Sequence, residues 1–175
     1  MRIENINSDY LKEMTEIVIN SYEKERKSVP YLPLDDGYEK EIEKYLENLI
    51  TNGTGVMAIS NNKVIGFLVG YKIEEFWGSC DGIYSPDFGH GLIKNANKNV
   101  YQKLYKYAAK KWVEEGYTHH ALTIYAHHKE VIDIFFWLGF GLRCIDAMRK
   151  VSLIQDVNQE IEIKKIKKDE ISKLV

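Results

Sequence analysis

The sequence predicts an α/β (α+β) fold in which one mixed central sheet carries helices on both faces. Two adjacent β-rich runs at 56–60 and 64–73 predict an antiparallel hairpin, and a long helical pattern at 97–115 separates two further β-rich runs. A strand-helix-strand unit places its strands in parallel, so the runs near Ser79 and Ala121 should lie parallel in the same sheet. The 175 residues suffice for one well-covered core and are too few for two domains of usual size.

The first sixth of the chain predicts a short strand over 1–6 and then a helix that ends near Lys27. Ser8 or Asp9 stands where a helix N-cap is expected. The apolar face of this helix comprises Leu11, Met14, Ile17 and Val18. After an extended stretch with Pro30 and Pro33, Asp35 or Asp36 can cap a second helix that ends at Asn52-Gly53. Its inward residues are predicted to be Ile42, Tyr45, Leu46, Leu49 and Ile50.

The remaining elements follow from turn residues and periodicity. Asn61-Asn62 joins the hairpin strands, because asparagine tolerates the positive φ that a tight turn demands. A third β-run at 79–84 precedes the long helix, whose apolar side comprises Val100, Leu104, Ala108 and Trp112. Gly116 ends that helix. The prediction is completed by a buried strand at 121–125, a short helix at 129–138 that ends at Gly139, and a last strand at 142–151.

Composition excludes several classes of protein. The formal net charge of −2 and pI near 6.2 give no positive field of the kind that non-specific nucleic-acid binding needs. Two cysteines are too few for a disulfide scaffold, the N-terminus does not resemble a signal peptide, and no apolar run approaches a membrane span. We therefore expect a soluble cytoplasmic protein without nucleic-acid or membrane partners.

Two pairs of neighbouring histidines, His119-His120 and His127-His128, raise the question of a metal site. Neighbours in a strand point to opposite sides, and no cysteine or third histidine stands at ligand spacing. We therefore predict no metal, and we expect His128 to lie at the cap of the helix that follows it.

The order of elements resembles the GNAT (N-acetyltransferase) superfamily over residues 1–151. The run at 64–70, VIGFLVG, resembles the strand of that family in which V-x-G-F follows a hairpin. The run at 112–116, WVEEG, resembles the end of its long helix, and Leu138-Gly139-Phe140 matches the L-G-F after its short helix. The resemblance implies a GNAT-like domain at 1–153 and a C-terminal extension at 154–175.

The resemblance implies acetyl-CoA as co-substrate and a place for it. In the family, the strands that correspond to 79–84 and 121–125 splay apart, the pantetheine arm lies between them, and the pyrophosphate lies at the N-terminus of the long helix. The cofactor-binding residues carried over in this way are Ile83, Tyr84, Ser85, Gly89, His90, Gly91, Asn97, Lys98, Asn99, Val100, Tyr101 and His127.

The phosphate loop departs from the family pattern R/Q-x-x-G-x-G/A. Counting back from Gly116 puts Ala96 at the Arg position and Asn99 and Tyr101 at the two glycines, which leaves Lys98 as the cation. Counting forward from the strand puts 89–92 at the loop instead. An insertion between Gly89 and Ala96 reconciles the counts; the alternative is a polar loop with a helix cap and no ligand.

The proton-transferring residues also depart from the family. The position of the usual acidic Tyr, four residues before the Gly of L-G-F, holds Phe135, which has no hydroxyl to donate. Tyr125, His127 and Tyr84 stand at strand ends that face the expected gap and can replace it. The candidate bases are Asp81 and, at the end of the hairpin strand, Glu74 and Glu75. Each of these residues can equally be structural.

An internal repeat links the two ends of the chain. Residues Ile3, Ile6, Asp9, Leu11 and Met14 match Ile163, Ile166, Asp169, Ile171 and Leu174 at a constant offset. One interpretation is that a second GNAT-like domain begins at the C-terminal extension; the other is that both are ordinary strand-to-helix starts.

Three functional hypotheses remain from the sequence. The first is an enzyme that transfers an acetyl group directly from acetyl-CoA to a primary amine, with a small cationic amine favoured. The second is a non-catalytic GNAT-like module that binds a CoA-type ligand or a partner domain, and the third is an unrelated α/β binding protein. A homodimer, or pairing with a second GNAT-like domain, is the expected assembly.

Overall fold

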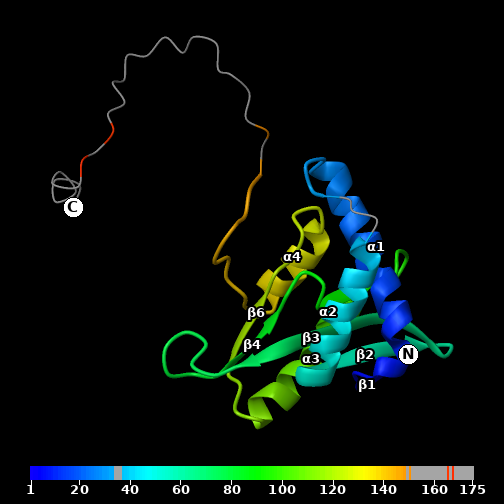
Figure 1. Cartoon of the computed structure of the whole chain (residues 1–175). Coiled ribbons are helices and arrows are strands. Elements are labelled where there is room, and N and C mark those ends of the chain that lie inside the picture. The colour runs from blue at the N-terminus through cyan, green and yellow to red at the C-terminus, as the bar shows by residue number, and fades with distance from the viewer. Residues whose placement is uncertain (34–36, 149, 151–164, 166, 168–175) are drawn as a thin grey trace.

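A computed structural model describes residues 1–33, 37–148, 150, 165 and 167. The colours of Figure 1 allow the reader to follow the helices and strands along the chain. The elements are β1 (Arg2–Asn5), a 3-10 turn (Ser8–Tyr10), α1 (Leu11–Ser28), α2 (Tyr38–Asn52), β2 (Thr54–Ser60), β3 (Lys63–Ile73), β4 (Gly82–Ser85), β5 (His90–Leu92), α3 (Val100–Glu114), β6 (His119–Leu122) and α4 (Lys129–Trp137).

The sheet is mixed, as the sequence predicts. Its strand order in the described part of the chain is β1-β2-β3-β4-β6, and β5 pairs with β3 beside β4. All strand pairings in the described part of the chain are antiparallel except that of β4 with β6, which confirms the parallel strand-helix-strand unit. The hairpin is also confirmed: Asn61 and Asn62 have φ of 50° and 58°.

Helices cover both faces of the sheet, which confirms the predicted layers. Met57 and Ile59 of β2 pack with Met14 of α1 and Leu46 of α2. Since successive strand residues point to opposite faces, Val56 and Ala58 lie on the other face, against Leu104 and Trp112 of α3. Figure 1 shows α1 and α2 crossing the sheet side by side.

Two predictions about the N-terminal half are corrected. The first cap is Asn7, whose side chain accepts from the Asp9 amide, in place of Ser8 or Asp9. Tyr45 was expected to face inward, but it is 51% exposed, because its ring tilts onto Phe88 at the border of the core. The predicted caps Asp35 and Asp36 lie outside the described residues.

Three predictions about the C-terminal half are corrected. Residues 142–148 form no strand, so the predicted last strand at 142–151 is wrong over its described residues, and β6 is the edge of the described sheet. The strands flanking α3 are offset: β4 begins three residues later than expected, and β6 begins and ends earlier. β5 was not predicted at all.

Predictions that fall on other parts of the chain are not tested by the fold. The domain boundary at 153 and the C-terminal partners in the internal repeat lie outside the described residues.

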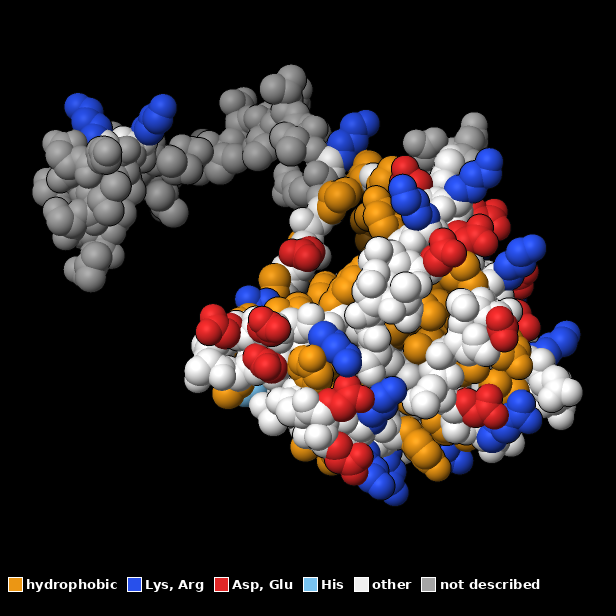
Figure 2. Space-filling view, turned by 60° about the horizontal axis from the view of Figure 1, so that its bottom comes forward, with side chains coloured by type: hydrophobic (Ala, Val, Ile, Leu, Met, Phe, Trp, Pro, Cys, Tyr) orange, Lys and Arg blue, Asp and Glu red, His pale blue; other side chains and the backbone are white. Residues whose placement is uncertain are grey.

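No described helix is long and apolar enough to cross a membrane. On the face in Figure 2, acidic and basic side chains are interspersed. Within the described ranges no group of three or more His, Cys, Asp or Glu side chains is placed to hold a metal ion.

Candidate functional site

The candidate site lies where β4 and β6 separate. The Thr123 amide donates to the Ser85 carbonyl at 3.0 Å, and beyond this bond the two strands take different paths. The chain after β4 makes a turn, in which Gly89 N–H donates to Pro86 O at 2.8 Å, and then returns to β3 as β5. Tyr71 pairs with Tyr84, and Leu68 pairs with His90. An advance of three residues along β3 therefore corresponds to an advance of six residues along the segment from β4 to β5. The surplus residues form a bulge at the gap.

The gap is crossed by the side chain of His90, which is 4% exposed. Its Nε2 lies 2.8 Å from the Thr123 carbonyl oxygen and its Nδ1 lies 3.0 Å from the Tyr101 hydroxyl. Burial lowers the pKa of His90, which keeps the ring neutral. A neutral ring with these neighbours donates from Nε2 and accepts from Tyr101 at Nδ1. His90 therefore ties β5 to the chain after β6.

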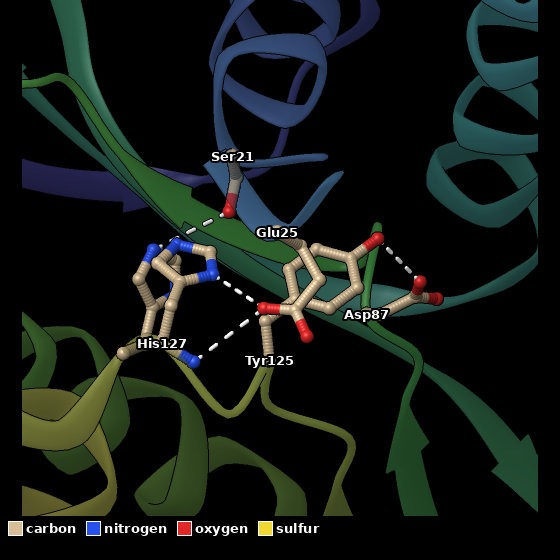
Figure 3. Close-up of polar contacts among 6 residues, drawn as sticks. Ser21, Glu25, Asp87, Tyr125 and His127 are labelled. Carbon is tan, nitrogen blue, oxygen red and sulfur yellow. Dashed lines mark hydrogen bonds and ion pairs between the residues drawn. The ribbon is translucent and has the colours of Figure 1, made fainter. Parts of the chain in front are cut away.

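A buried carboxylate from α1 reaches the same region. Glu25 is 7% exposed, and its Oε2 accepts a hydrogen bond from Nδ1 of His127 at 2.6 Å and one from the His127 amide at 3.4 Å (Figure 3). These two contacts fix the orientation of the imidazole. They also leave Nε2, the other ring nitrogen, without a hydrogen-bond partner among the described residues.

Tyr125 makes the second bridge across the gap. Its hydroxyl donates to Oδ2 of Asp87 at 2.6 Å, and its ring is stacked on that of His127 with centroids 5.9 Å apart (Figure 3). Burial first, and then the charge of Asp87, raise the pKa of Tyr125, so the phenol keeps its proton. Tyr22 and Tyr38 stack on each other at 4.1 Å beside it, and together these rings form an aromatic wall.

The side chain of His128 lies between this cluster and a pocket at the surface. Its Nε2 lies 3.4 Å from the Ser21 hydroxyl, and its ring centroid lies 3.9 Å from that of His127. Burial, followed by the neighbouring His127, lowers the pKa of His128 to about 3. The ring is therefore neutral at physiological pH.

Three buried polar atoms at the gap have no hydrogen-bond partner among the described residues. They are Ser85 Oγ, His127 Nε2 and His128 Nδ1. Buried polar atoms in proteins are nearly always satisfied, and leaving one unpaired costs about 1–3 kcal/mol. Three such atoms around one gap indicate a place for a polar ligand.

The structure brings some predicted residues to the gap and separates others. Ser85, Tyr125 and His127 lie there. The hydroxyl of Tyr84 lies 2.8 Å from the hydroxyl of Thr123, on an exposed surface next to the gap. The side chain of Ile83 belongs to the hydrophobic core that packs against α3.

Asp81 is kept away from the gap by its own contacts. It precedes β4, at the end of that strand opposite to the gap. Its Oδ1 accepts from the Glu75 amide at 3.0 Å, and its carbonyl accepts from Thr118. Its carboxylate therefore closes a turn.

The glycines of the expected phosphate loop serve close packing. Gly91 lies within β5, and a Cβ there would come within 2.4 Å of Cγ2 of Ile17 on α1. At Gly89 a Cβ would come within 2.7 Å of Oγ of Ser85. The inserted segment therefore adds a strand that packs against α1, where the sequence predicts a phosphate loop.

The start of α3 carries the remaining predicted residues. The Asn99 amide donates to Oδ1 of Asn97 at 2.9 Å, and the amides of Val100 and Tyr101 donate to carbonyls of the same turn at 3.0 Å. Lys98 lines pockets on both sides of this turn. Phe135, at the position of the family's Tyr, is buried against Tyr101.

Sequence reasoning missed Ser21, Glu25 and Asp87. A signal existed for Glu25: Met14, Val18 and Tyr22 form one buried stripe of α1, and Glu25 is the next residue on it, one turn after Tyr22. A carboxylate on an apolar stripe requires a partner, which here is His127. No comparable signal marks Ser21 or Asp87.

Comparison with solved structures identifies the fold. The chain is similar to an aminoglycoside N-acetyltransferase, AAC(6')-Iy, in complex with CoA, with a TM-score of 0.59, 14% identity, and coverage of 85% of this chain and 93% of that one. An aminoglycoside 6'-N-acetyltransferase from Acinetobacter haemolyticus gives 0.60 at 15% identity, covering 87% and 100%.

A ribosomal-protein-alanine N-acetyltransferase from Brucella melitensis gives a TM-score of 0.58 at 12% identity, covering 86% of this chain and 100% of that one. No family model and no curated protein sequence matches the chain. Together the structural matches define the class: the chain has the GNAT acetyltransferase fold.

Proposed function

We propose that the protein is an acetyl-CoA-dependent N-acetyltransferase that transfers the acetyl group directly to a primary amine. The observation that carries this proposal is the group of three unpartnered buried atoms, Ser85 Oγ, His127 Nε2 and His128 Nδ1, at the point where β4 and β6 separate. In a fold shared with N-acetyltransferases, hydrogen-bonding capacity at that point suits a thioester and its pantetheine amides.

The residues at the gap fit acetyl-CoA as co-substrate. Ser21 and His128 line a pocket beside the gap, and Ser85, at the end of β4, has a buried hydroxyl without a partner that can donate to a carbonyl oxygen. Acetyl-CoA supplies the activated carbonyl carbon, and the protein supplies the donors and the orientation.

His127 is the residue best arranged to move the proton. An ammonium group first loses one proton to water; the neutral amine nitrogen then forms a bond to the acetyl carbon, the carbon–sulfur bond breaks, and the CoA thiolate leaves. Nε2 of His127 takes the proton that the amine loses, and the thiolate takes up one proton from the same nitrogen or from water. Glu25 acts as a positioning residue, since its carboxylate holds Nδ1–H and stabilises the imidazolium.

Two of the earlier catalytic candidates keep a place in this proposal, and one does not. Tyr125, with a raised pKa, keeps its proton in the hydrogen bond to Asp87 and so orients that carboxylate at the gap. Tyr84, on the exposed side, lies beside the path of an incoming amine. Asp81 has no role here, because its carboxylate closes a turn at the other end of β4.

The acceptor that suits the site is a small cationic amine. Asp87 and Glu25 place carboxylates beside the aromatic wall, and an ammonium group gains from both. One of the similar structures is of an aminoglycoside acetyltransferase in complex with sisomicin, a likeness that supports an amine acceptor without identifying one. Cytoplasmic location and pairing with a second copy or domain stay predictions that this proposal does not need.

A second candidate function is a GNAT-like module that binds without turnover. Two side-chain bridges, from His90 to the Thr123 carbonyl and from Tyr125 to Asp87, cross the gap that a pantetheine arm needs. Phe135 also replaces the usual acid. Under this alternative the chain holds a CoA-type ligand or a partner domain and transfers nothing.

The experiment that separates the two measures release of free CoA thiol from acetyl-CoA in the presence of diamines and aminoglycosides, with mass spectrometry of the amine. The proposal predicts amine-dependent thiol release and a product that carries one acetyl group. Acetyl-CoA binding without any acetylated product would favour the module and overturn the transferase.

A further inference from the structure

A pocket beside the gap is positively charged at one end. It has a volume of about 340 Å³ and lies between α1, the start of β3, the segment after β5 and the first turns of α3 and α4. Lys24, Lys94 and Lys98 line it, together with Ser21 and His128. Glu13 and Glu16 also line it, but Glu16 precedes Lys24 by eight helical residues, which is about 12 Å along α1.

The lysines at this end are held near one another without a carboxylate. Among the described residues, no ion pair involves Lys24, Lys94 or Lys98. Burial first, and then the charges of Lys98, Lys94 and Lys27, lower the pKa of Lys24. Like charges that repel one another without a counter-charge are typical of a site that an anion completes.

The N-terminus of α3 is a poor site for the same anion. Its first amides are already used, by Oδ1 of Asn97 and by carbonyls of the preceding turn. The open hollow in front of this turn is lined by Lys98 and by Glu130 and Asp133 of α4, so its two carboxylates outweigh its one ammonium group and disfavour a phosphate. Both features count against an anion at the place where the family resemblance put it.

We propose that the phosphate groups of a CoA-type nucleotide bind in the lysine pocket on the α1 side, held by Lys24, Lys94 and Lys98, and not at the N-terminus of α3. This inference rests on the proposed function for the identity of the nucleotide. A diphosphate offers several charge-assisted bonds to ammonium groups within one pocket.

The pocket borders the gap at His128. Ser21 and His128 form part of its lining, and the ring of His128 contacts that of His127, whose Nδ1 is bound by Glu25. An extended ligand with its phosphates on the lysines can therefore reach the reactive nitrogen past neutral His128. Lys24 and Glu25, adjacent on α1, then serve the two ends of one ligand.

The test measures binding to the full chain by calorimetry with acetyl-CoA, acetyl-pantetheine and inorganic pyrophosphate as separate probes. Lys24→Ala and Lys94→Ala should each weaken acetyl-CoA and pyrophosphate by about tenfold, the loss of one charge-assisted bond, and leave acetyl-pantetheine unchanged. Lys12→Ala, an exposed lysine of α1 outside the pocket, is the matched control and should bind all probes as the parent does.

Two further outcomes decide the inference. Asn97→Ala removes the cap that occupies the Asn99 amide, and binding of pyrophosphate should change less than twofold in this variant. Unchanged acetyl-CoA affinity in both lysine variants, or pyrophosphate that fails to bind the parent, overturns the lysine pocket. Lysine-dependent pyrophosphate binding without acetyl transfer would support the phosphate site and refute the transferase. Acetyl transfer that is unchanged in the lysine variants would support the transferase and refute the phosphate site.

Discussion

The proton transfer that we propose at the gap depends on two side chains that lie 102 residues apart in the chain. Glu25 on α1 fixes the ring of His127, and the ring offers Nε2 to the gap. Their separation in sequence explains why the sequence predicts His127 at the site and not its partner. Periodicity assigns Glu25 to a buried stripe, but it cannot say what lies opposite that stripe.

Replacing these two residues should affect turnover more than binding. His127→Gln should lower kcat by about 10²- to 10⁴-fold, the usual contribution of a general base, with acetyl-CoA affinity kept. Glu25→Gln should lower kcat less and alter the pH profile, and Glu25→Asp should restore part of both. His119→Gln, a histidine at the far end of β6, is the control. Steady-state kinetics at several pH values would contradict the assignment if all variants kept the parent's kcat and pH profile.

At the scale of elements, the sequence predicts what is long and periodic. Both helices of the first half, the hairpin and α3 follow from apolar spacing and turn residues, and the fold confirms them. β5 escapes prediction, because three residues with a central glycine carry no β signal; their pairing with β3 makes them a strand. The opposite error occurs at 142–148, where the sequence predicts a strand. The β-like sequence there has no strand partner among the described residues, so no strand forms.

β5 positions α1, and this can be tested at one glycine. Gly91→Ala places a methyl group within 2.4 Å of the stiff, buried Ile17 side chain, so it should destabilise the fold by about 1–3 kcal/mol. Since α1 carries Ser21, Lys24 and Glu25, acetyl-CoA affinity should fall as well. Gly141→Ala, where nothing lies within 4 Å, should leave both unchanged. Urea unfolding at equal midpoints for the two variants would refute the role of β5.

At the scale of the whole molecule, the fold creates the site by letting two parallel strands part. Residues near 21–25, 85–90 and 123–128 meet at that point, and no local pattern connects the three segments. The order of elements therefore predicts where a site lies. It does not predict that side-chain bridges cross the gap or that Lys24 of α1 lies near Lys94 and Lys98, because both depend on contacts between distant segments.

A calorimetric titration of the full chain with acetyl-CoA tests the central claim most directly, with desulfo-CoA as a non-transferring control. We expect saturable binding at one site, with a Kd on the order of micromolar that weakens as salt is added. Absence of measurable heat and of any thermal stabilisation at millimolar acetyl-CoA would contradict the account, because the gap and its lysine pocket would then hold no cofactor.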